Sequence, residues 1–357
     1  MTEPSRRLDG GPQRAEVPAS PAPERRLIAC LPGDGIGPEV LDQAVRVLEH
    51  LPVDIEVVRL PFGGAAIDVA GEPLPAATLE RCRESRGILL GAVGGPKWDG
   101  GTVRPEAGLM GLRKALDVYA NLRPAVADGV DLVIVRELVG GLYFGRRGVL
   151  SDGTVFDTCE YHPAQIERIA HRAFELARTR RGSVVSVDKA NVLDTSRLWR
   201  RVVTEVAAGY PGVELRHALV DSAAMEIVTD ADRFDVIVTE NTFGDILSDI
   251  AAAVTGGLGL AASASLGDGG PGIFEPVHGS APDIAGAGVA NPAAMLRSLA
   301  LLLEHALDRR DLAEALVVAV DETLASHPTP DLGGDATTAS FGDAVLASLS
   351  GMLVGAG

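Results

Sequence analysis

The chain has 357 residues, 46% of them hydrophobic, which is enough for a sizeable core in two lobes or in one large α/β unit. Its formal net charge of -17 opposes contact with nucleic acid and with anionic membrane surfaces, so both are excluded as partners. Three widely spaced cysteines without a CxxC motif indicate free thiols in a reducing compartment, which predicts a cytoplasmic protein.

The chain begins with a segment that differs from the rest. Residues 1–25 are rich in Pro, Arg, Ala and Glu and lack the apolar stretch of a secretory signal, which predicts a disordered tail. Short apolar runs then alternate with helical periods. We predict strands at residues 27–31, 53–60, 87–93 and 130–135. Helices are predicted to begin at Pro38 and Pro163, and the chain from Asn291 onward is predicted to be mainly helical. No apolar run reaches the roughly 20 residues that a membrane span requires.

Polar residues follow four strand-like runs in the middle of the chain. The runs are residues 132–135, 184–187, 215–220 and 236–239. The polar residues that follow them include Arg136, Lys189, Asp221 and Asn241. Ligands of open α/β sheets bind outside the carboxyl ends of the strands, so parallel strands would gather these side chains at one edge. Polar residues often end strands, but the mixture of Arg, Lys and Asp favours the rim of an active site.

A glycine-rich turn, LPGDGIGPEV at residues 31–40, follows the first predicted strand and opens a helix. Its glycines have the spacing GxGxG, which differs from the GxGxxG of a dinucleotide-binding loop. The spacing therefore favours a tight strand-to-helix turn. A position beside a cofactor stays open as the alternative.

Asp245 and Asp249 lie four residues apart in the otherwise apolar segment GDILSDIAAA. On a helix they share one face, where like charges repel each other, and no basic residue flanks them. One interpretation is a solvated acidic face. The other is a site for a divalent cation, to which Asp221 would add a third carboxylate. A set of carboxylates without His or thiolate favours Mg²⁺ or Mn²⁺ over Zn²⁺.

Three arginines are candidates for binding an anion. Arg113 is predicted on a helix, Arg123 just after a strand and Arg136 at a strand end. Arginine binds carboxylate through two parallel hydrogen bonds, so the three could hold a dicarboxylate. The alternative is that they are three unrelated surface arginines.

A loop near the C-terminal third is a candidate cofactor site. It begins with HGSAPD at residues 278–283. Asp283 could accept hydrogen bonds from an adenosine ribose and would repel a 2′-phosphate, which would select NAD over NADP. The alternative is a Gly/Pro turn with a helix cap at Asn291.

The motifs together resemble those of one enzyme family. The matching stretches are LPGDGIGPEV at residues 31–40, LGAVGGPKW at 90–98, ANLRP at 120–124, VREL at 135–138, SVDKANV at 186–192, TENTFGDILSD at 239–249 and FEPVHGSAPD at 274–283. They resemble the β-decarboxylating dehydrogenases, the family of isocitrate and isopropylmalate dehydrogenases. The resemblance implies a two-domain α/β fold that binds NAD without a Rossmann loop and has its active site in the interdomain cleft. It places residues 26–119 and 256–357 in an NAD-binding first domain, and residues 120–255 in a second domain with the dimer interface and an arm.

The resemblance also implies roles for residues of this sequence. Tyr161 and Lys189 match the catalytic residues. The residues that match the substrate site are Arg113, Arg123, Arg136, Asp221, Glu106, Leu109, Met110 and Val192. The residues that match the cofactor site are His278, Gly279, Ser280, Ala281, Pro282, Asp283, Ile284, Ala285 and Asn291. Asp221, Asp245 and Asp249 match the metal ligands, and a homodimer is expected in which Asp221 and Lys189 reach the site of the partner subunit.

The activity implied by the resemblance is the oxidation and decarboxylation of 3-isopropylmalate to 4-methyl-2-oxopentanoate, with NAD and Mg²⁺ or Mn²⁺, in leucine biosynthesis. A related enzyme for another 3-substituted malate is the alternative, since Met110 stands where the family typically has Leu. A non-catalytic regulatory subunit is disfavoured because the lysine, the tyrosine and the metal aspartates are all present.

The sequence departs from the family pattern in two further places. The connection between Pro124 and Val130 is shorter than usual, which predicts a trimmed edge of the second domain. Residues 144–153 differ in the segment that leads into the arm, which leaves the geometry of the arm open.

Overall fold

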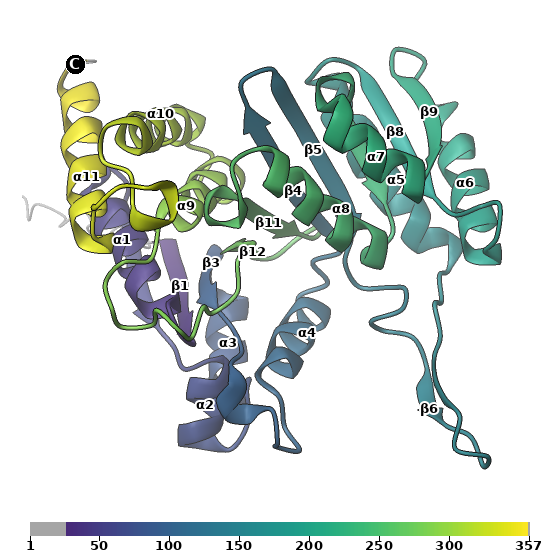
Figure 1. The fold of residues 1–357 in the computed structure, drawn as a ribbon, viewed down its shortest axis with the longest axis horizontal. Helices are drawn as coiled ribbons and strands as arrows, with labels where there is room; N and C mark the ends of the chain where they lie inside the picture. The colour runs from purple at the N-terminus through teal and green to yellow at the C-terminus, as the bar shows by residue number, and fades with distance from the viewer. Residues whose placement is uncertain (1–25, 356–357) are drawn as a thin grey trace, which may run out of the picture.

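The computed structural model describes residues 26–355, so the tail predicted at residues 1–25 lies outside the described residues. Its centre is one mixed sheet of ten strands (Figure 1). The strands stand in the order β2 (Ile55–Arg59), β1 (Arg26–Gly33), β3 (Gly87–Ala92), β12 (Gly272–Pro276), β11 (Ala262–Leu266), β4 (Ala120–Ala127), β5 (Val130–Glu137), β10 (Val236–Thr239), β8 (Ser183–Asp188) and β9 (Glu214–Leu219). The α/β class and the predicted strands are confirmed.

The sheet consists of two parallel halves joined by an antiparallel centre. β2, β1, β3 and β12 run parallel to one another, as do β5, β10, β8 and β9. Between the halves, β11 pairs antiparallel with β12 and β4, and β4 pairs antiparallel with β5. The first half comes from both ends of the chain and the second from its middle, in keeping with the two expected domains. Because the sheet is continuous between them, the residues at the domain boundary stay a prediction.

Within the described residues, eleven α-helices cover the two faces of the sheet. They are α1 (Gly37–His50), α2 (Gly63–Ala70), α3 (Ala76–Glu84), α4 (Pro105–Ala115), α5 (Pro163–Arg178), α6 (Asp194–Ala207), α7 (Val220–Thr229), α8 (Asn241–Val254), α9 (Ala293–His305), α10 (Arg310–Ser326) and α11 (Thr338–Gly355). The helices predicted at Pro38 and Pro163 and in the C-terminal part are confirmed. None of these helices is long and apolar enough to cross a membrane.

The buried apolar side chains are arranged differently on the two faces of the sheet. Successive strand residues point to opposite faces, and one face carries a single continuous core that includes Leu299 of α9 and Phe174 of α5. On the other face the core is split. Leu112 of α4 belongs to a cluster in the first half, whereas Leu247 of α8 belongs to a cluster in the second. The interruption between α4 and α8 leaves a place for polar side chains where the two halves meet.

The connection between β4 and β5 is a two-residue turn in the middle of the sheet. Ala127 pairs with Val130, which leaves Asp128 and Gly129 as the turn. Gly129 has a φ of +75°, the left-handed conformation that such hairpin turns require. The edges of the sheet are β2 and β9, and the trimmed edge of the second domain stays a prediction. Antiparallel neighbours need only a short turn, so the short connection closes a hairpin between two central strands.

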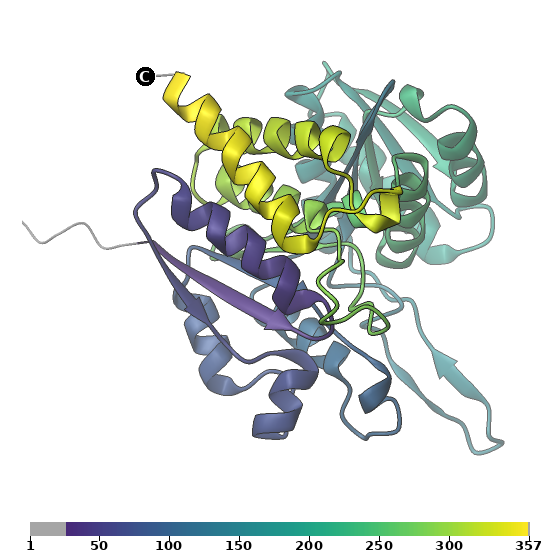
Figure 2. The same ribbon diagram turned by 60° about the vertical axis from the view of Figure 1, so that its left-hand side comes forward.

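A thin arm extends from the body of the molecule, as Figure 1 and Figure 2 show. It consists of β6 (Arg147–Val149) and β7 (Val155–Asp157), which form a separate two-stranded sheet. Val149, Leu150 and Val155 on this arm are exposed. An isolated hairpin of two strands is marginally stable in water, so the arm is suited to contact another surface.

Candidate active site

The parallel strands bring the four predicted strand-end residues together in two pairs. Arg136, at the end of β5, donates from Nε and Nη2 to Oδ1 of Asn241 at 3.0 and 2.7 Å. Lys189, after β8, donates from Nζ to Oδ1 of Asp221 at 2.6 Å. Strand-end reasoning therefore identified residues that do meet, and the order of the strands sorted them into two groups.

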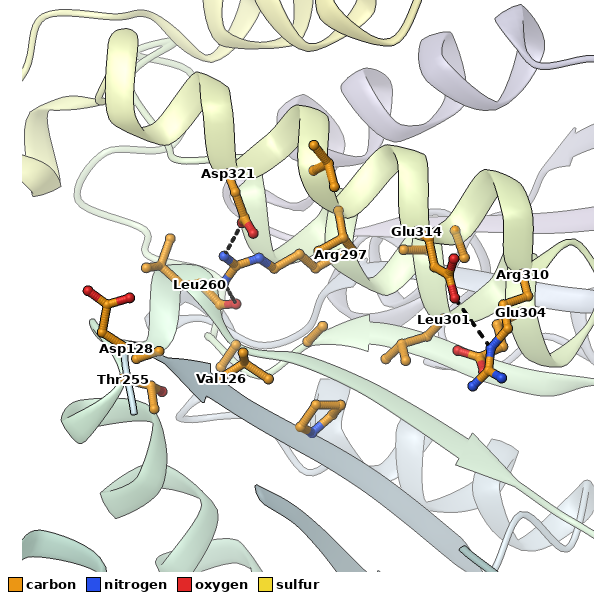
Figure 3. A pocket seen from close by; sticks show the side chains of 18 residues that line it. Val126, Asp128, Thr255, Leu260, Arg297, Leu301, Glu304, Arg310, Glu314 and Asp321 are labelled. Carbon is orange, nitrogen blue, oxygen red and sulfur yellow. Dashed lines mark hydrogen bonds and ion pairs between the residues drawn. The ribbon is translucent and has the colours of Figure 1, made fainter. Parts of the chain in front are cut away.

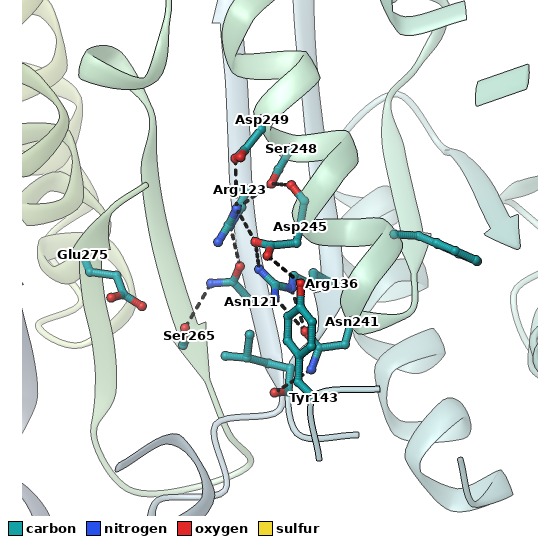
Figure 4. Close-up of polar contacts among 12 residues, drawn as sticks. Asn121, Arg123, Arg136, Tyr143, Asn241, Asp245, Ser248, Asp249, Ser265 and Glu275 are labelled. Atoms are coloured by element: carbon teal, nitrogen blue, oxygen red, sulfur yellow. Dashed lines mark hydrogen bonds and ion pairs between the residues drawn. The ribbon is translucent and has the colours of Figure 1, made fainter. Parts of the chain in front are cut away.

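The first group belongs to a larger arginine–aspartate cluster, which comprises Arg123, Arg136, Tyr143, Asp245 and Asp249 (Figure 4). Nη1 of Arg123 lies 3.4 Å from Oδ1 of Asp245 and 3.7 Å from Oδ1 of Asp249. Arg136 forms an ion pair with Asp245, and the hydroxyl of Tyr143 donates to Oδ2 of Asp245 at 3.0 Å. Arg136 is only 2% exposed, so the cluster is anchored inside the protein.

The helical interpretation of the two aspartates is correct, but their surroundings differ from the expectation. α8 carries both, and both face Arg123. No basic residue flanks them in the sequence, but in the fold Arg123 of β4 and Arg136 of β5 supply a counter-charge. Arg136 and Asp245 are 109 residues apart in the sequence, so the local segment contains no sign of this partner. Arg123 itself lies within β4 rather than just after a strand.

Burial and mutual charge set the ionisation of the cluster. Burial, followed by the positive charge of Arg123, lowers the pKa of Arg136 to about 10 against the opposing effect of Asp245. Burial acts to raise the pKa of Asp245, but Arg136 and Arg123 outweigh it, so that pKa lies below its usual value. Burial raises the pKa of Asp249, against the charge of Arg123. The charges therefore compensate one another inside the cluster, and a charged ligand has to replace some of these contacts.

Arg113 approaches the cluster from α4. Its Nη2 donates to Oε1 of Glu275 on β12 at 2.7 Å, and both side chains are largely buried. After burial, the charge of Arg113 is among the causes that lower the pKa of Arg123 and of Arg136, so the three cations face a common region. Among the described residues, nothing accepts a hydrogen bond from the buried Nε of Arg113. The alternative of three unrelated surface arginines is therefore wrong.

Three other predicted substrate residues share α4 with Arg113. Glu106, Leu109 and Met110 precede it by seven, four and three positions, which places them on one side of the helix. Leu109 and Met110 are half-buried, and Glu106 is exposed. Val192 is different, because it is 61% exposed in the turn that follows β8, where its N–H donates to the carbonyl of Lys189.

The structure places Tyr143, and not Tyr161, in the cluster. The hydroxyl of Tyr161 donates to Oε2 of Glu240 at 3.3 Å and accepts from the N–H of Asn241 at 2.9 Å. Its ring packs edge-on against Trp199, with the centroids 5.6 Å apart, and burial raises its pKa far above the usual value. These contacts hold Tyr161 against Glu240, Asn241 and Trp199, whereas Tyr143 contacts Asp245 of the cluster. The catalytic role of Tyr161 stays a prediction, and Tyr143 is a second candidate for it.

One feature of the sequence places Tyr143 where a ligand could approach it. This tyrosine follows Arg136 by seven residues, in a glycine-rich turn directly after the strand. Residues just beyond the carboxyl ends of strands are those that approach ligands. The motif containing Tyr161 lies after the arm instead, at the start of α5.

The carboxylates expected to bind a metal are divided between the two groups. Asp245 and Asp249 stand on one face of α8, whereas Asp221 is paired with Lys189. Across residues 26–355, no group of three or more His, Cys, Asp or Glu side chains is arranged to hold a metal ion. A three-carboxylate site made by one chain alone is therefore not formed. Two carboxylates without thiolate still suit a hard divalent cation, provided that a further donor comes from outside the chain.

The glycine-rich turn after β1 lies against the predicted cofactor loop. The N–H of Ile36 donates to the carbonyl of Ser280 at 2.8 Å. Gly35 has a φ of +57°, and a Cβ atom there would lie 1.9 Å from the same carbonyl oxygen, so this contact requires glycine. The tight-turn interpretation is confirmed, and the turn also supports the loop.

The rest of the cofactor loop combines a structural cap with an exposed stretch. Oδ1 of Asn291 accepts from the N–H of Ala293 at 2.9 Å at the start of α9, as the helix-cap alternative predicts. Asp283 lies in the exposed stretch at residues 282–287. The loop therefore presents its acidic residue to solvent, while Asn291 holds its end.

A groove of about 840 Å³ lies apart from the cluster, between α9, α10 and the turn of the β4–β5 hairpin (Figure 3). Its charged residues are four acids and two arginines. They are Asp128, Glu304, Glu314, Asp321, Arg297 and Arg310. Both arginines are paired, Arg297 with Asp321 at 2.6 Å and Arg310 with Glu304 at 3.1 Å. The excess of carboxylates repels an anionic substrate, so the arginine–aspartate cluster is the better candidate.

The fold and the cluster together define a class of protein. The sheet is continuous and has two parallel halves. Buried arginines face two aspartates where the halves meet. Both features agree with the motifs that resemble the β-decarboxylating dehydrogenases. Residues 27–345 match the isocitrate/isopropylmalate dehydrogenase family, and the chain belongs to this family.

Individual relatives agree with the family. The chain is 52% identical to the 3-isopropylmalate dehydrogenase of Oleidesulfovibrio alaskensis, over 85% of this chain and 93% of that protein. It is 53% identical to the 3-isopropylmalate dehydrogenase of Shouchella clausii, over 84% of this chain and 89% of that protein. The crystal structure of isocitrate dehydrogenase from Methylococcus capsulatus is similar with a TM-score of 0.85 and 40% identity, and the match covers 91% of this chain and 99% of that chain. The family makes this chain a dehydrogenase that acts on a small molecule.

Glu137 is a buried residue beside the cluster that the sequence did not single out. It ends β5 next to Arg136, and its carboxylate accepts from the N–H groups of Val139 at 3.2 Å and Gly140 at 2.8 Å. Burial raises the pKa of Glu137 to about 7, although these hydrogen bonds lower it. The carboxylate holds the start of the turn that leads to Tyr143, and it titrates near neutral pH.

We expect the stability of the chain to depend on the ionisation of Glu137. Its pKa rises from 4.5 to about 7 on folding, so the folded state binds this proton more tightly than the unfolded state. The resulting stabilisation is complete below pH 4.5 and is lost as the pH rises through 7, by about 3 kcal/mol. The free energy of unfolding, measured with urea, should fall between mildly acidic and mildly alkaline pH. This fall should be smaller for Glu137→Gln than for the parent chain. Equal pH dependence in both chains would contradict this assignment.

Proposed function

We propose that this chain oxidises and decarboxylates 3-isopropylmalate to 4-methyl-2-oxopentanoate with NAD, a step of leucine biosynthesis. The observation that carries the proposal is that Arg123 and Arg136 face the same aspartate, while Arg113 lies on α4 with Leu109 and Met110. Three guanidinium groups suit two carboxylates, and the apolar side of α4 suits an alkyl group at C3. Relatives named 3-isopropylmalate dehydrogenase, at 52% and 53% identity, support the same substrate.

A second candidate is the same chemistry on another 3-substituted malate. Met110 favours it, because methionine is flexible and adapts to irregular space. An apolar pocket distinguishes alkyl groups by only about 1–3 kcal/mol per methylene, so a neighbouring substituent could be preferred. A non-catalytic subunit is the least favoured candidate, since Lys189, Tyr143 and the aspartates are present.

Charge balance indicates how the ligands would bind. In the chain alone, Arg123 and Arg136 neutralise Asp245. A dicarboxylate that takes these arginines leaves the aspartates without a counter-charge, which a divalent cation supplies. We therefore infer that Asp245 and Asp249, with the partner subunit's Asp221, hold Mg²⁺ or Mn²⁺.

The residues of the chain supply the binding contacts and the proton transfers. A bound NAD would supply hydride acceptance at C2, and a bound divalent cation would supply charge stabilisation at the C2 oxygen. The partner subunit's Lys189 takes the proton of the C2 hydroxyl. After CO₂ has left, Tyr143 gives its proton to C3. Its hydroxyl already donates to Asp245 within the cluster, which puts this proton beside the arginines that bind the substrate.

The loop at residues 278–291 is proposed as the adenosine site of NAD. Its exposed acid, Asp283, is suited to accept hydrogen bonds from ribose hydroxyls and to repel a 2′-phosphate. Ser280 is held by the glycine-rich turn and Asn291 by its cap, so the loop is supported at two points.

A homodimer with shared active sites is part of the proposal. Lys189 is paired with Asp221 rather than with the cluster. Met225 and Val228 of α7 are 70% and 62% exposed, and Ile246 of α8 is 54% exposed, which gives an apolar surface on two helices that contact each other. Covering this surface with a second copy about a two-fold axis would bring each Lys189–Asp221 pair towards the cluster of the other chain.

The cellular location that we infer is the cytoplasm. Cys30, Cys82 and Cys159 are free thiols. Burial raises the pKa of Cys30 and of Cys82 to about 12, so both are protonated and unreactive. Unpaired cysteines are typical of a reducing compartment.

The proposed activity is tested by NADH formation with purified protein, NAD and Mg²⁺. We expect 3-isopropylmalate to give a higher kcat/KM than isocitrate, malate, tartrate and 3-alkylmalates with larger substituents. Reactions with NADP, and reactions with a chelator in place of Mg²⁺, serve as controls. A preference for another 3-substituted malate would move the chain to the second candidate, and no turnover of any of them would refute the dehydrogenase assignment.

The two tyrosines are distinguished by substitution. Tyr143→Phe is expected to lower kcat by about 100-fold or more, because it removes the proton that C3 receives. Tyr161→Phe keeps the packing against Trp199 and loses the hydrogen bond from Asn241, so it should lower stability by about 1 kcal/mol and kcat by less than about tenfold. Steady-state kinetics and urea unfolding of both variants decide the matter. The opposite order of kcat losses would restore Tyr161 as the proton donor.

The shared site is tested by mixing two inactive variants. Lys189→Met and Asp245→Asn should each abolish turnover. When equal amounts are unfolded and refolded together, about half of the dimers are mixed, and each mixed dimer has one intact site if Lys189 serves the other chain's Asp245. The mixture should therefore regain about a quarter of the parent activity. Activity that stays absent in a mixture shown to contain mixed dimers would mean that each site is built from one chain.

A further inference from the structure

A buried side chain, that of Asn241, links Arg136 to the turn that leads to Tyr143. An asparagine side chain can accept two hydrogen bonds through its oxygen and donate two through its nitrogen. Oδ1 of Asn241 accepts from Nε and Nη2 of Arg136 at 3.0 and 2.7 Å. Nδ2 donates to the carbonyls of Leu138 at 3.1 Å and Gly140 at 3.0 Å. All four capacities are used, and Asn241 is fully buried.

The backbone around Asn241 is fixed as well. Asn241 is the first residue of α8, and its N–H donates to the hydroxyl of Tyr161 at 2.9 Å. The preceding residue, Glu240, accepts from the N–H of Phe243 at 2.6 Å and from Tyr161 at 3.3 Å. A Cβ atom on Gly141 would lie 2.5 Å from the Tyr161 hydroxyl, so the turn passes closely over this ring. The start of α8, Tyr161 and the turn therefore support one another.

We propose that Asn241 is a positioning residue that fixes the position of Arg136 relative to the turn that carries Tyr143. One side chain thereby aligns the group that binds the carboxylate with the group that protonates C3. This inference rests on the proposed function, in which Tyr143 is the proton donor. Both aligned groups also contact Asp245, one helical turn after Asn241 on α8. Misplacement of a reacting group by about 1 Å can lower a rate by about 100-fold, so this alignment has a measurable effect.

A substitution can separate the hydrogen bonds that the Asn241 side chain accepts from those that it donates. An aspartate has nearly the same shape and still accepts from Arg136. Its second oxygen would face the carbonyls of Leu138 and Gly140 and could not donate to them. Asn241→Asp therefore keeps the contact with the arginine and removes the two hydrogen bonds from residue 241 to the turn.

Asn121 offers a matched control in the same region. It is also fully buried, its Oδ1 accepts from Nε of Arg123 at 2.8 Å, and its Nδ2 donates to Oγ of Ser265 at 3.0 Å. Asn121 thus orients the other arginine of the cluster, but its second contact is with β11 and not with the turn. Asn121→Asp adds the same negative charge beside an arginine and leaves the two hydrogen bonds from residue 241 to the turn intact.

The test is steady-state kinetics of the parent enzyme, Asn241→Asp and Asn121→Asp in H₂O and in D₂O. Both variants should raise KM, because each places a new carboxylate beside a substrate-binding arginine. Asn241→Asp alone should lower kcat by about 30-fold or more and enlarge the solvent isotope effect on kcat, since misplacing Tyr143 slows proton transfer. Asn121→Asp should keep kcat within about threefold of the parent and leave its isotope effect unchanged.

The outcomes separate this inference from the proposed function. A parent enzyme that turns over no 3-substituted malate would overturn both. An active parent, with the same kcat and isotope effect in the two variants, would overturn the role of Asn241 alone. If circular dichroism shows that Asn241→Asp does not fold, Asn241→Gln takes its place, because its longer stem displaces the turn while keeping both polar groups. Parent-like kcat in that variant would also refute the inference.

Discussion

The contact between the buried Arg136 and the partly exposed Asp245 is the interaction on which the rest of the site depends. A charge removed from water is unfavourable unless it is paired and hydrogen-bonded, and loss of one partner costs roughly 3–5 kcal/mol. Arg123 and Tyr143 complete the environment of Asp245, and Asn241 completes that of Arg136. Because the charges balance in the chain alone, an anion that takes the arginines leaves the aspartates to be neutralised by a cation. The charge pattern of the cluster thus defines the charges of its ligands.

The topology of the sheet explains how these residues come together. The tight β4–β5 hairpin sets Arg123 and Arg136 on neighbouring central strands. β10 pairs with β5 on the other side, and α8 follows β10 directly, so Asp245 is delivered next to Arg136. The core on this face is split between the two halves of the sheet, and polar side chains occupy the interruption. A single continuous core on the opposite face keeps the halves in register.

Lys189 and Asp221 are residues of the kind that the proposed reaction needs, but they are paired with each other rather than with the arginine–aspartate cluster. Lys189 neutralises Asp221 in the same chain, and apolar residues of α7 and α8 near this pair are exposed. The arm adds a further exposed apolar surface. These features have one common explanation in a second copy of the chain, which would use the pair in its own site and cover the exposed side chains.

The sequence by itself determined the α/β class, the helical face shared by Asp245 and Asp249, and the strand ends at which functional residues gather. These features depend on periodicity and on neighbouring residues, which are local. The tertiary structure decided which charges are paired, because Arg136 and Asp245 meet only through the order of the strands. It also decided which tyrosine contacts Asp245, since the directions of the Tyr143 and Tyr161 side chains are set by packing around the turn and α8. This packing is not encoded in the residues on either side of a tyrosine.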